Sequence, residues 1–431
     1  MGSVMYNFID HSTAAAIEKA RYYNSTDKYS FSSFNIDNQA KTKQKNKKVY
    51  FDYNATTPIH SESLEVMLEV LHMPANPSSI HYFGQIAKGF IEKARLQIAN
   101  TLDIPLSHDK FNCIFVSSGT EANNLLLTSF KKVYKNGIII TCATEHLSIL
   151  NCARNYNDTQ IIDVDDKGIV DLIQLQNTLY SNKGLPLLVT IMLVNNETGV
   201  IQPLEEIVRL SKEHQAWVHS DCSQAFSKIP VNITQLNLDF ATISSHKIGG
   251  PIGAASLIAK SPNFITPQMV GGGQENGIRA GTENVAAIAG FGKAVELLPK
   301  MLKQSNFTKT LRQYLEDKIS RIDNKIKIFG QNAPRVGNTS MIMMPEVTSQ
   351  QQILYFDING FAVSVGSACS SGQLKQSYVL TAMKIPDHEA DCAIRISLGW
   401  NNTEEEIKQF YTLWQKQYLY HIKASNIKKQ A

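Results

Sequence analysis

From about residue 50 onward, short apolar runs alternate with longer stretches of helical period. Strands and helices that alternate in this way build a mainly parallel sheet with helices on both faces. We expect strands at residues 113–116, 138–142, 161–164, 187–193, 216–220, 240–243 and 254–258. Helical periodicity is clear between them, for example at residues 121–134 and 204–214. The pattern therefore predicts an α/β fold.

The rest of the chain has a different character. A length of 431 residues suggests two to three domains, or one large unit with a smaller one. After about residue 300, a long polar helical stretch precedes short strands and a final helix from Glu404 to about Tyr420, which indicates a second, α+β domain. Residues 1–48 are rich in Ser, Asn, Lys and Tyr, and we expect them to be loosely ordered apart from one short helix near residues 14–22.

Composition excludes several classes of protein. The net charge of +4 gives no reason to expect nucleic acid or an anionic membrane as the main partner. The longest apolar run, residues 185–194, is too short to cross a bilayer. Six cysteines in a chain of this length match neither a disulfide framework nor a zinc pattern, so we expect reduced thiols and a cytoplasmic protein. An organellar matrix is the alternative if the N-terminal segment is a targeting peptide, although that segment holds one arginine and four acids.

Two motifs resemble binding signatures but fail when their residues are checked. The run Gly271-Gly-Gly-Gln-Glu-Asn-Gly277 has Asn276 where a dinucleotide fingerprint needs its last glycine. The pair His388-Glu389 is followed by Cys392 where a metalloprotease has its second histidine. The sequence therefore indicates neither a nicotinamide enzyme nor a metal site.

Lys247 and Asp221 each follow an apolar strand. Lys247 lies in Ser244-Ser-His-Lys247-Ile-Gly-Gly, at the carboxyl end of a predicted strand, where open α/β sheets bind their ligands. A lysine there can form a Schiff base with an aldehyde cofactor, and the alternative is a solvated loop lysine. A buried Asp221 can pair with a pyridinium nitrogen, with Gln224 donating to the ring oxygen, or it can simply cap the next turn.

Three other segments contain residues that are suited to binding or catalysis. In Ser117-Ser-Gly119-Thr120-Glu-Ala-Asn123, small residues open a helix and form an anion site, although Ser118 and Glu121 also match a capping box. Gly366-Ser-Ala-Cys369-Ser-Ser-Gly surrounds a thiol with small residues, as on a mobile loop, whereas a surface cysteine without a role is the alternative. Arg395 either binds a carboxylate or is an edge-strand charge.

Together these segments resemble the cysteine desulfurases of the class V aminotransferase family, which are fold type I enzymes that depend on pyridoxal 5'-phosphate. The resemblance runs from about Val49 to Tyr420 through motifs at residues 50–58, 76–79, 118–121, 144–146, 194–199, 221–224, 244–247, 279–284, 366–369 and 395–399. It implies a large domain, residues 60–299, with a mainly parallel seven-stranded sheet. It also implies a smaller α+β domain made of residues 49–59 and 300–431, and it places the cysteine in the mobile-loop group.

The resemblance assigns a role to each motif residue. Lys247 corresponds to the Schiff-base lysine and proton shuttle, and Cys369 to the sulfur acceptor that becomes a persulfide. The expected cofactor contacts are His146 stacked on the ring, Asp221 at the pyridine nitrogen, Gln224 at the phenolic oxygen, Gly119, Thr120, Ser244 and His246 near the phosphate, and Thr282 from the partner subunit of a homodimer. Asn196 and Arg395 correspond to the residues that bind the carboxylate of L-cysteine.

The implied reaction converts L-cysteine to L-alanine and passes the sulfur to an acceptor or an iron–sulfur scaffold protein, for cluster assembly or for thiolation of tRNA or cofactors. Some residues depart from the family pattern. Cys222 and Ser245 stand where smaller residues are usual, and Asn276 replaces an arginine common in one branch. The chain is expected to end soon after its last helix, which puts docking of a scaffold by a longer tail in doubt. Cys222 and Cys392 have apolar neighbours and are expected to be structural.

Overall fold

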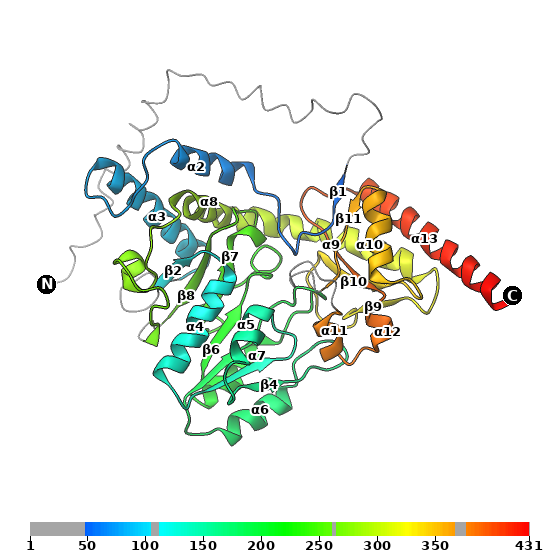
Figure 1. Cartoon of the computed structure of the whole chain (residues 1–431), viewed down its shortest axis with the longest axis horizontal. Helices are drawn as coiled ribbons and strands as arrows, with labels where there is room; N and C mark the ends of the chain where they lie inside the picture. Colours follow the sequence, from blue (N-terminus) through cyan, green and yellow to red (C-terminus); the bar gives the residue numbers. More distant parts are fainter. Residues whose placement is uncertain (1–47, 105–111, 261–263, 367–375, 431) are drawn as a thin grey trace, which may run out of the picture.

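The computed structural model describes residues 48–104, 112–260, 264–366 and 376–430. The short helix expected near residues 14–22 lies outside these ranges. The centre of the molecule is one seven-stranded sheet with the strand order β2-β8-β7-β6-β5-β3-β4 (Figure 1). Its strands are β2 (Asn112–Val116), β3 (Ile138–Cys142), β4 (Gln160–Ile162), β5 (Leu187–Thr190), β6 (Trp217–Asp221), β7 (Phe240–Ser244) and β8 (Ala255–Ala259).

The sheet confirms the α/β prediction and its seven strands. Neighbouring strands from β7 to β4 run parallel, whereas β8 runs antiparallel to both β7 and β2. Two strands end two or more residues before the predicted bound, and all other bounds agree with the prediction to within one residue. β5 ends at Thr190 rather than at residue 193, and β4 ends at Ile162 although apolar residues continue to Val164. Val164 instead forms an isolated bridge with Val170. Apolar character marks burial in both places, but only part of each buried run finds a neighbouring strand.

Helices cover both faces of the sheet, as Figure 1 shows. On one face, α3 (Tyr82–Thr101), α6 (Leu172–Ser181), α7 (Leu204–Glu213) and α8 (Val285–Glu296) contribute to one large apolar core. On the other face, α4 (Gly119–Val133) and α5 (Leu147–Ala153) pack against the sheet in a second core. The helix α2 (Ser61–Leu71) lies against α8. Burying strands on both faces is what makes them read as continuous apolar runs.

The C-terminal part of the chain has its own core. A three-stranded antiparallel sheet, in the order β12-β10-β9, is built from β9 (Lys327–Phe329), β10 (Thr339–Met343) and β12 (Ala393–Ser397). The surrounding helices are α9 (Leu298–Ser320), α10 (Ser349–Ile358), α11 (Tyr378–Ala382), α12 (Asp387–Ala390) and α13 (Glu404–Gln430). The last helix therefore continues about ten residues beyond the predicted end near Tyr420, because no Gly or Pro interrupts it.

The segment at the start of the described chain joins this second core. β1 (Val49–Tyr50) pairs in parallel with β11 (Phe361–Ala362), and Phe51 packs edge-on against Phe410 of α13. From Phe51 the chain crosses to the large sheet and enters α2, so residues 52–57 lie between the two cores. In the described part of the chain, no helix is both long and apolar enough to cross a membrane.

Candidate active site

Polar residues gather at the carboxyl edge of the large sheet. β6 ends at Asp221, its parallel neighbour β7 ends at Ser244, and the 3-10 turn η1 (Ser245–Lys247) then carries His246 and Lys247. Neighbouring parallel strands end at the same edge, which is where open α/β sheets bind ligands. The structure thus brings these four residues together where the sequence predicts them.

The Lys247 side chain reaches the segment that crosses between the two cores. Its Nζ donates to the carbonyl oxygens of Asn54 and Ala55, at 2.5 and 2.7 Å. Lys247 is half-buried and its amine is hydrogen-bonded, which disfavours the alternative of a solvated loop lysine. An amine placed among uncharged carbonyl groups in a partly desolvated site is suited to act as a nucleophile.

Asp221 is fixed by two different donors. Its Oδ1 accepts from the Ser223 N–H at 3.0 Å, and its Oδ2 accepts from the amide of Asn123 at 2.9 Å. The first bond is the turn cap that the sequence offered as the alternative, and the second bond orients the carboxylate. Asp221 therefore caps a turn and keeps a fixed direction at the same time.

Asn123 connects Asp221 to His146. The Asn123 amide donates to Ser148 Oγ at 2.8 Å, and that hydroxyl lies 2.7 Å from His146 Nδ1. His146 also caps α5, because its Nδ1 accepts from the Ser148 N–H. Sequence reasoning gave Asn123 no role. The available signal was a fully buried amide on the apolar side of α4.

The start of α4 lies against the end of β7. A Cβ added to Gly119 would contact Ser244 Cβ at 3.7 Å and Ser223 Oγ at 3.6 Å. Ser118 caps the helix by accepting from the Glu121 N–H at 3.1 Å. The predicted capping box is only half right, because the Glu121 carboxylate accepts from the N–H of Ser117 instead of from Ser118. The first N–H groups of α4 precede its hydrogen-bond ladder and can serve an anion.

The other predicted phosphate residues occupy different surroundings. His246 Nδ1 lies 3.2 Å from Thr56 Oγ1, and burial together with the nearby Lys247 lowers the pKa of His246 to about 4. A neutral imidazole at physiological pH follows from that value. Thr120 is exposed at the start of α4. Thr282, between η3 (Gln274–Gly277) and α8, is also exposed and stands apart from the contacts around Lys247 among the described residues.

Arg395 and Asn196 are in direct contact. Arg395 Nη1 donates to the Asn196 carbonyl at 3.1 Å, and Nη2 donates to Asp52 Oδ1 at 2.7 Å. Arg395 lies on β12, an edge strand of the three-stranded sheet, but it is only 3% exposed, which disfavours the alternative of a plain edge-strand charge. Arg395 Nε and Asn196 Oδ1 are buried and have no partner among the described residues. An unmet donor on a buried arginine fits an anionic ligand, and the Asp52 contact is one that sequence reasoning missed.

A second set of missed residues surrounds Gln224. Gln224 Nε2 donates to the Asn54 carbonyl at 2.9 Å, and its Oε1 accepts from the Lys228 amine. The Lys228 amine also donates to Asn54 Oδ1 at 2.7 Å. Asn54 is 1% exposed, and its Nδ2 donates to the Asn196 carbonyl at 3.0 Å. Asn54 belongs to the motif at residues 50–58, but the sequence analysis assigned no role to it.

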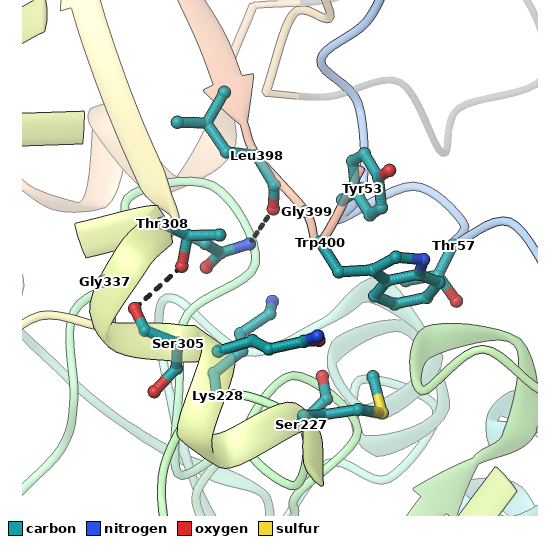
Figure 2. Close-up of a pocket in the computed structure, with 13 residues that line it drawn as sticks. Tyr53, Thr57, Ser227, Lys228, Ser305, Thr308, Gly337, Leu398, Gly399 and Trp400 are labelled. Atoms are coloured by element: carbon teal, nitrogen blue, oxygen red, sulfur yellow. Dashed lines mark hydrogen bonds between the residues drawn. The ribbon is translucent and has the colours of Figure 1, made fainter. Parts of the chain in front are cut away.

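Lys228 also lines a small cavity behind these contacts. Figure 2 shows it among Tyr53, Ser305 and Trp400, which come from three separate segments of the chain. The cavity has a volume of about 40 Å³, about the space that one water occupies in the liquid. It is therefore too small for a cofactor, and it belongs to the junction between the two cores.

Glu197 lies beside both ends of the segment 367–375, next to Gly366 on one side and Ser377 on the other. Its Oε2 accepts from the Ser377 hydroxyl at 2.5 Å, and a Cβ on Gly366 would overlap the same carboxylate. Its Oε1 has no partner among the described residues. Burial raises the pKa of Glu197 to about 6, against the opposing effects of Ser377, Arg395 and His146. Cys369 itself lies outside the described residues, so its placement stays a prediction.

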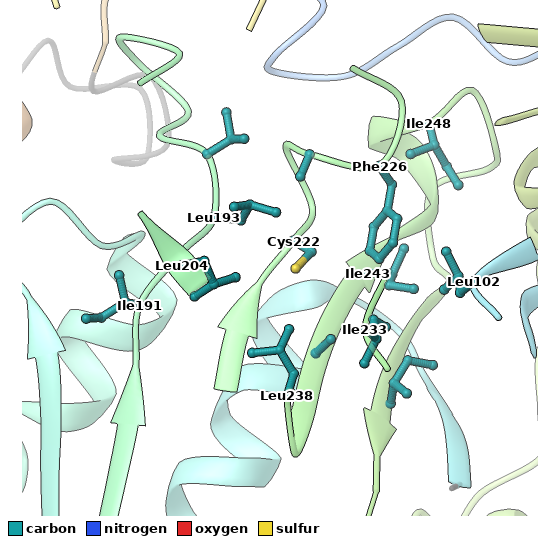
Figure 3. Close-up of a cluster of buried hydrophobic side chains, with 14 of the residues drawn as sticks. Leu102, Ile191, Leu193, Leu204, Cys222, Phe226, Ile233, Leu238, Ile243 and Ile248 are labelled. Carbon is teal, nitrogen blue, oxygen red and sulfur yellow. The ribbon is translucent and has the colours of Figure 1, made fainter. Parts of the chain in front are cut away.

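The five described cysteines are all buried, and none of them forms a disulfide with another described cysteine. They are Cys113, Cys142, Cys152, Cys222 and Cys392. Figure 3 shows Cys222 within a cluster of apolar side chains, close to Leu193 and Leu238. Burial raises the pKa of Cys222 to about 12, so this thiol remains protonated. The prediction that Cys222 and Cys392 are structural is consistent with their burial.

The residues present fit pyridoxal phosphate. Lys247 offers an amine for its aldehyde, Asp221 offers an oriented carboxylate for its pyridinium nitrogen, and the first turn of α4 offers N–H groups for its phosphate. The space beside Gly119 that a Cβ would fill lies between that turn and the end of β7. Amine, carboxylate and anion site thus share one edge of the sheet.

Comparisons with known proteins identify the family of this chain. The family model described as aminotransferase class-V matches residues 49–410. The cysteine desulfurase IscS of Dictyoglomus turgidum is 37% identical over 85% of this chain and 93% of its own length, and that of Rickettsia typhi is 38% identical over 83% and 88%. A NifS-like protein from Rickettsia africae superimposes with a TM-score of 0.80, at 41% identity over 86% of this chain and 99% of that chain. Together with the geometry described above, these matches show that the chain belongs to the aminotransferase class-V family.

Proposed function

We propose that this protein is a cysteine desulfurase, which converts L-cysteine to L-alanine and keeps the sulfur as a persulfide on Cys369. The observation that carries the proposal is the convergence of Lys247, Asp221 and the start of α4 at one sheet edge, with the buried Arg395 beside Asn196. Relatives named cysteine desulfurase cover most of the chain, which supports the same reaction.

Substrate binding is assigned to the anion site of the second core. Arg395 is held in place by Asp52 and by the Asn196 carbonyl, so its remaining N–H groups keep a fixed direction toward a carboxylate. Because Arg395 is almost fully buried, the charge–charge attraction is only weakly screened by water. These residues orient the α-amino group of L-cysteine toward the sheet edge that carries Lys247.

Proton transfer is assigned to Lys247 and His146. When bound through Lys247, pyridoxal phosphate supplies an electron sink beside the substrate Cα. Lys247 Nζ is the basic group that would move a proton at the substrate Cα, and carbonyl groups of the crossing segment hold it at the sheet edge. His146 is oriented by Ser148, so its Nε2 is the ring nitrogen left to exchange a proton.

The sulfur step is assigned to Cys369. Its thiolate attacks the substrate sulfur, so one S–S bond forms while the substrate C–S bond breaks, and the electron pair of that bond returns to carbon. Two protons then complete L-alanine, and Cys369 carries the terminal sulfur. None of the five described cysteines can take this role, because all of them are buried.

The test is a paired measurement of alanine release and protein persulfide after mixing with L-cysteine and pyridoxal phosphate. Lys247→Ala is expected to lower alanine release by at least about 10³-fold, because it removes the nucleophile. Cys369→Ser should abolish the persulfide but keep the yellow colour, and Cys392→Ala is the matched buried control that should retain both. Full alanine release by Cys369→Ser would indicate a different reaction of the same cofactor.

We also propose that the protein works as a homodimer, with Thr282 completing the partner's phosphate site. Exposed apolar side chains support this, chiefly Ile80 (93%), Val270 (87%) and Ile252 (77%). The segments around Ile80 and Val270 are neighbours, because Gln274 donates to Ser78 Oγ at 3.5 Å. Exposed apolar side chains on neighbouring segments favour a second copy of the chain as the partner.

The dimer is tested by light scattering after size-exclusion chromatography. Val270→Asp is expected to give monomers that bind pyridoxal phosphate more weakly, whereas Ile358→Asp, at a 72% exposed position on α10, should remain dimeric. A monomeric wild type that binds the cofactor normally would contradict this proposal.

Three further expectations stand as proposals. The absence of disulfides among the described cysteines favours a reducing, cytoplasmic compartment. The packing of Phe51 with α13 and the pairing of β1 with β11 support the assignment of residues 49–59 and 300–431 to one small domain, beside a large domain of residues 60–299. The persulfide on an otherwise small-residue segment is suited to delivery to an acceptor protein, for iron–sulfur clusters or for thiolation.

A further inference from the structure

The amine of Lys228 bonds two side-chain amides at once. Its Nζ donates to Asn54 Oδ1 at 2.7 Å and to Gln224 Oε1. Burial, together with the positive charges of Lys247 and Arg395, lowers the pKa of Lys228 well below its usual range. Both acceptors are uncharged amide oxygens, and a neutral amine also has N–H groups to donate, so the two bonds persist in either protonation state.

These bonds decide which way each amide points. With Gln224 Oε1 on the Lys228 amine, its Nε2 faces the Asn54 carbonyl at 2.9 Å. A rotation of the Gln224 amide by half a turn would place two donors together at Lys228 and two acceptors together at Asn54. Both hydrogen bonds would then be lost within a buried site, where unmet polar groups cost most.

The donor end of Gln224 thereby points to the carbonyl group that also holds Lys247. The Asn54 carbonyl accepts from Gln224 Nε2 and also from Lys247 Nζ at 2.5 Å, so the two nitrogens share one acceptor. Asn54 is itself fixed, because its Nδ2 donates to Thr339 Oγ1 at 2.9 Å and to the Asn196 carbonyl at 3.0 Å. The carbonyl therefore gives Gln224 and Lys247 a constant relative position.

We propose that Lys228 is a positioning residue, which locks the Gln224 amide with its N–H₂ group toward Lys247 so that the phenolic oxygen of pyridoxal phosphate meets a donor. The inference rests on the proposed function, because it concerns the cofactor that Lys247 binds. Lys228 does not touch the reacting atoms in this arrangement; it acts on the cofactor through Gln224, which Asn54 also helps to hold. A merely structural lysine would stabilise the junction between the cores without changing the cofactor.

The experiment is a pH titration of the visible absorption band of the holoenzyme. A donor to the phenolic oxygen favours the deprotonated form of the bound cofactor, so loss of the donor raises the midpoint. Gln224→Leu and Lys228→Met are each expected to raise the midpoint by about one pH unit, which is about tenfold in proton affinity. The double variant is expected to shift no further than either single variant, because both remove the same interaction.

Lys131→Met is the matched control. Lys131 is also a buried lysine that donates to carbonyl groups, those of Lys135 and Gly137, but it lies in the last turn of α4, about 18 Å along the helix from the sheet edge. This variant should lower the melting temperature and leave the midpoint unchanged. Lys228→Arg, which keeps a donor, should restore most of the wild-type midpoint.

The possible outcomes separate the inference from the proposed function. A wild type with no visible band in pyridoxal phosphate contradicts the proposed function. A normal wild-type band with an unshifted midpoint in Lys228→Met, or additive shifts in the double variant, overturns the role of Lys228 alone. If Lys228→Met does not fold, Lys228→Gln serves instead, because its shorter side chain cannot bridge both amides, and an unchanged midpoint in that variant also overturns the inference.

Discussion

Two clusters of buried charge in this protein are built in different ways. In the second core, the Glu316 carboxylate accepts from Arg312 at 2.9 Å, from Arg335 at 3.0 Å and from Ser340 at 2.6 Å. At the candidate active site, by contrast, four buried atoms lack a partner among the described residues, namely Glu145 Oε2, Asn196 Oδ1, Glu197 Oε1 and Arg395 Nε.

The difference teaches which buried charges are structural. A cluster that satisfies its own hydrogen bonds needs no ligand, whereas unmet polar atoms in a buried site carry a cost that only a bound molecule or water offsets. Burial, together with the nearby Asp221, raises the pKa of Glu145 well above its usual range, against the opposing hydrogen bond from the Met192 N–H. The candidate active site thus keeps buried polar atoms without hydrogen-bond partners among the described residues, whereas the Glu316 carboxylate has three donors.

The largest expected effect is on the Glu316 cluster of the second core. Glu316→Ala leaves Arg312 and Arg335 buried without a counter-charge, so we expect a loss of about 3–5 kcal/mol in the free energy of unfolding. Urea denaturation measures this loss. KM for L-cysteine should remain unchanged in whatever fraction stays folded, and a raised KM with normal stability would reverse the comparison.

A substitution among the unpaired groups of the candidate active site should change activity rather than stability. Arg395→Met removes the group that orients the substrate carboxylate, so we expect kcat/KM for L-cysteine to fall about 100-fold, which corresponds to about 2.7 kcal/mol. The measurement is steady-state alanine release, with the melting temperature recorded beside it. A large loss of stability with unchanged kcat/KM would place Arg395 with the structural cluster.

The pH dependence of stability sharpens the same contrast. Burial raises the pKa of Glu197 from 4.5 to about 6, so the folded state binds this proton more tightly than the unfolded state does. The contribution is therefore fully present below about pH 4.5 and is lost as the pH rises through about 6. Between pH 4.5 and 7, wild type should lose about 2 kcal/mol relative to Glu197→Gln in urea denaturation. Parallel stability curves for the two proteins would contradict it.

The smallest expected effect concerns the apolar core. Cys222→Ala removes one sulfur atom from a tightly packed cluster, so we expect a loss of about 1 kcal/mol in the free energy of unfolding. Alanine release should be unchanged, because the protonated thiol takes no part in the proposed reaction. A drop in activity without a drop in stability would show that Cys222 influences its neighbour Asp221.

The sequence predicted the sheet because its strands are buried on both faces and therefore appear as apolar runs. Residues at strand ends, such as Lys247 and Asp221, were predicted for the same reason, since a strand end fixes where the next side chain lies. The turn after β5 was misjudged as strand because buried loops share the same composition. Cys369 lies beyond what the structure describes.

Residues that act across the two cores could not be found in this way. Asn54 and Lys228 are 174 residues apart in the chain, and neither follows a periodic pattern. Their importance comes from the long-range approach of the crossing segment, residues 52–57, to the sheet edge and to Thr339 of β10, which local patterns do not encode. Glu197 stands in a family motif, but only the fold shows that its carboxylate contacts both Gly366 and Ser377.

The crossing segment at Asn54 has a mechanical consequence. Its side chain is bonded to Thr339 and Asn338 of the second core, while its carbonyl holds the amine of Lys247 in the first. Any rotation of one half against the other must therefore stretch the bonds that set the position of the nucleophile. When the Lys247 amine bonds an aldehyde, its hydrogen bond to the Asn54 carbonyl is lost. Cofactor binding should therefore reduce the resistance of the two cores to rotation against each other.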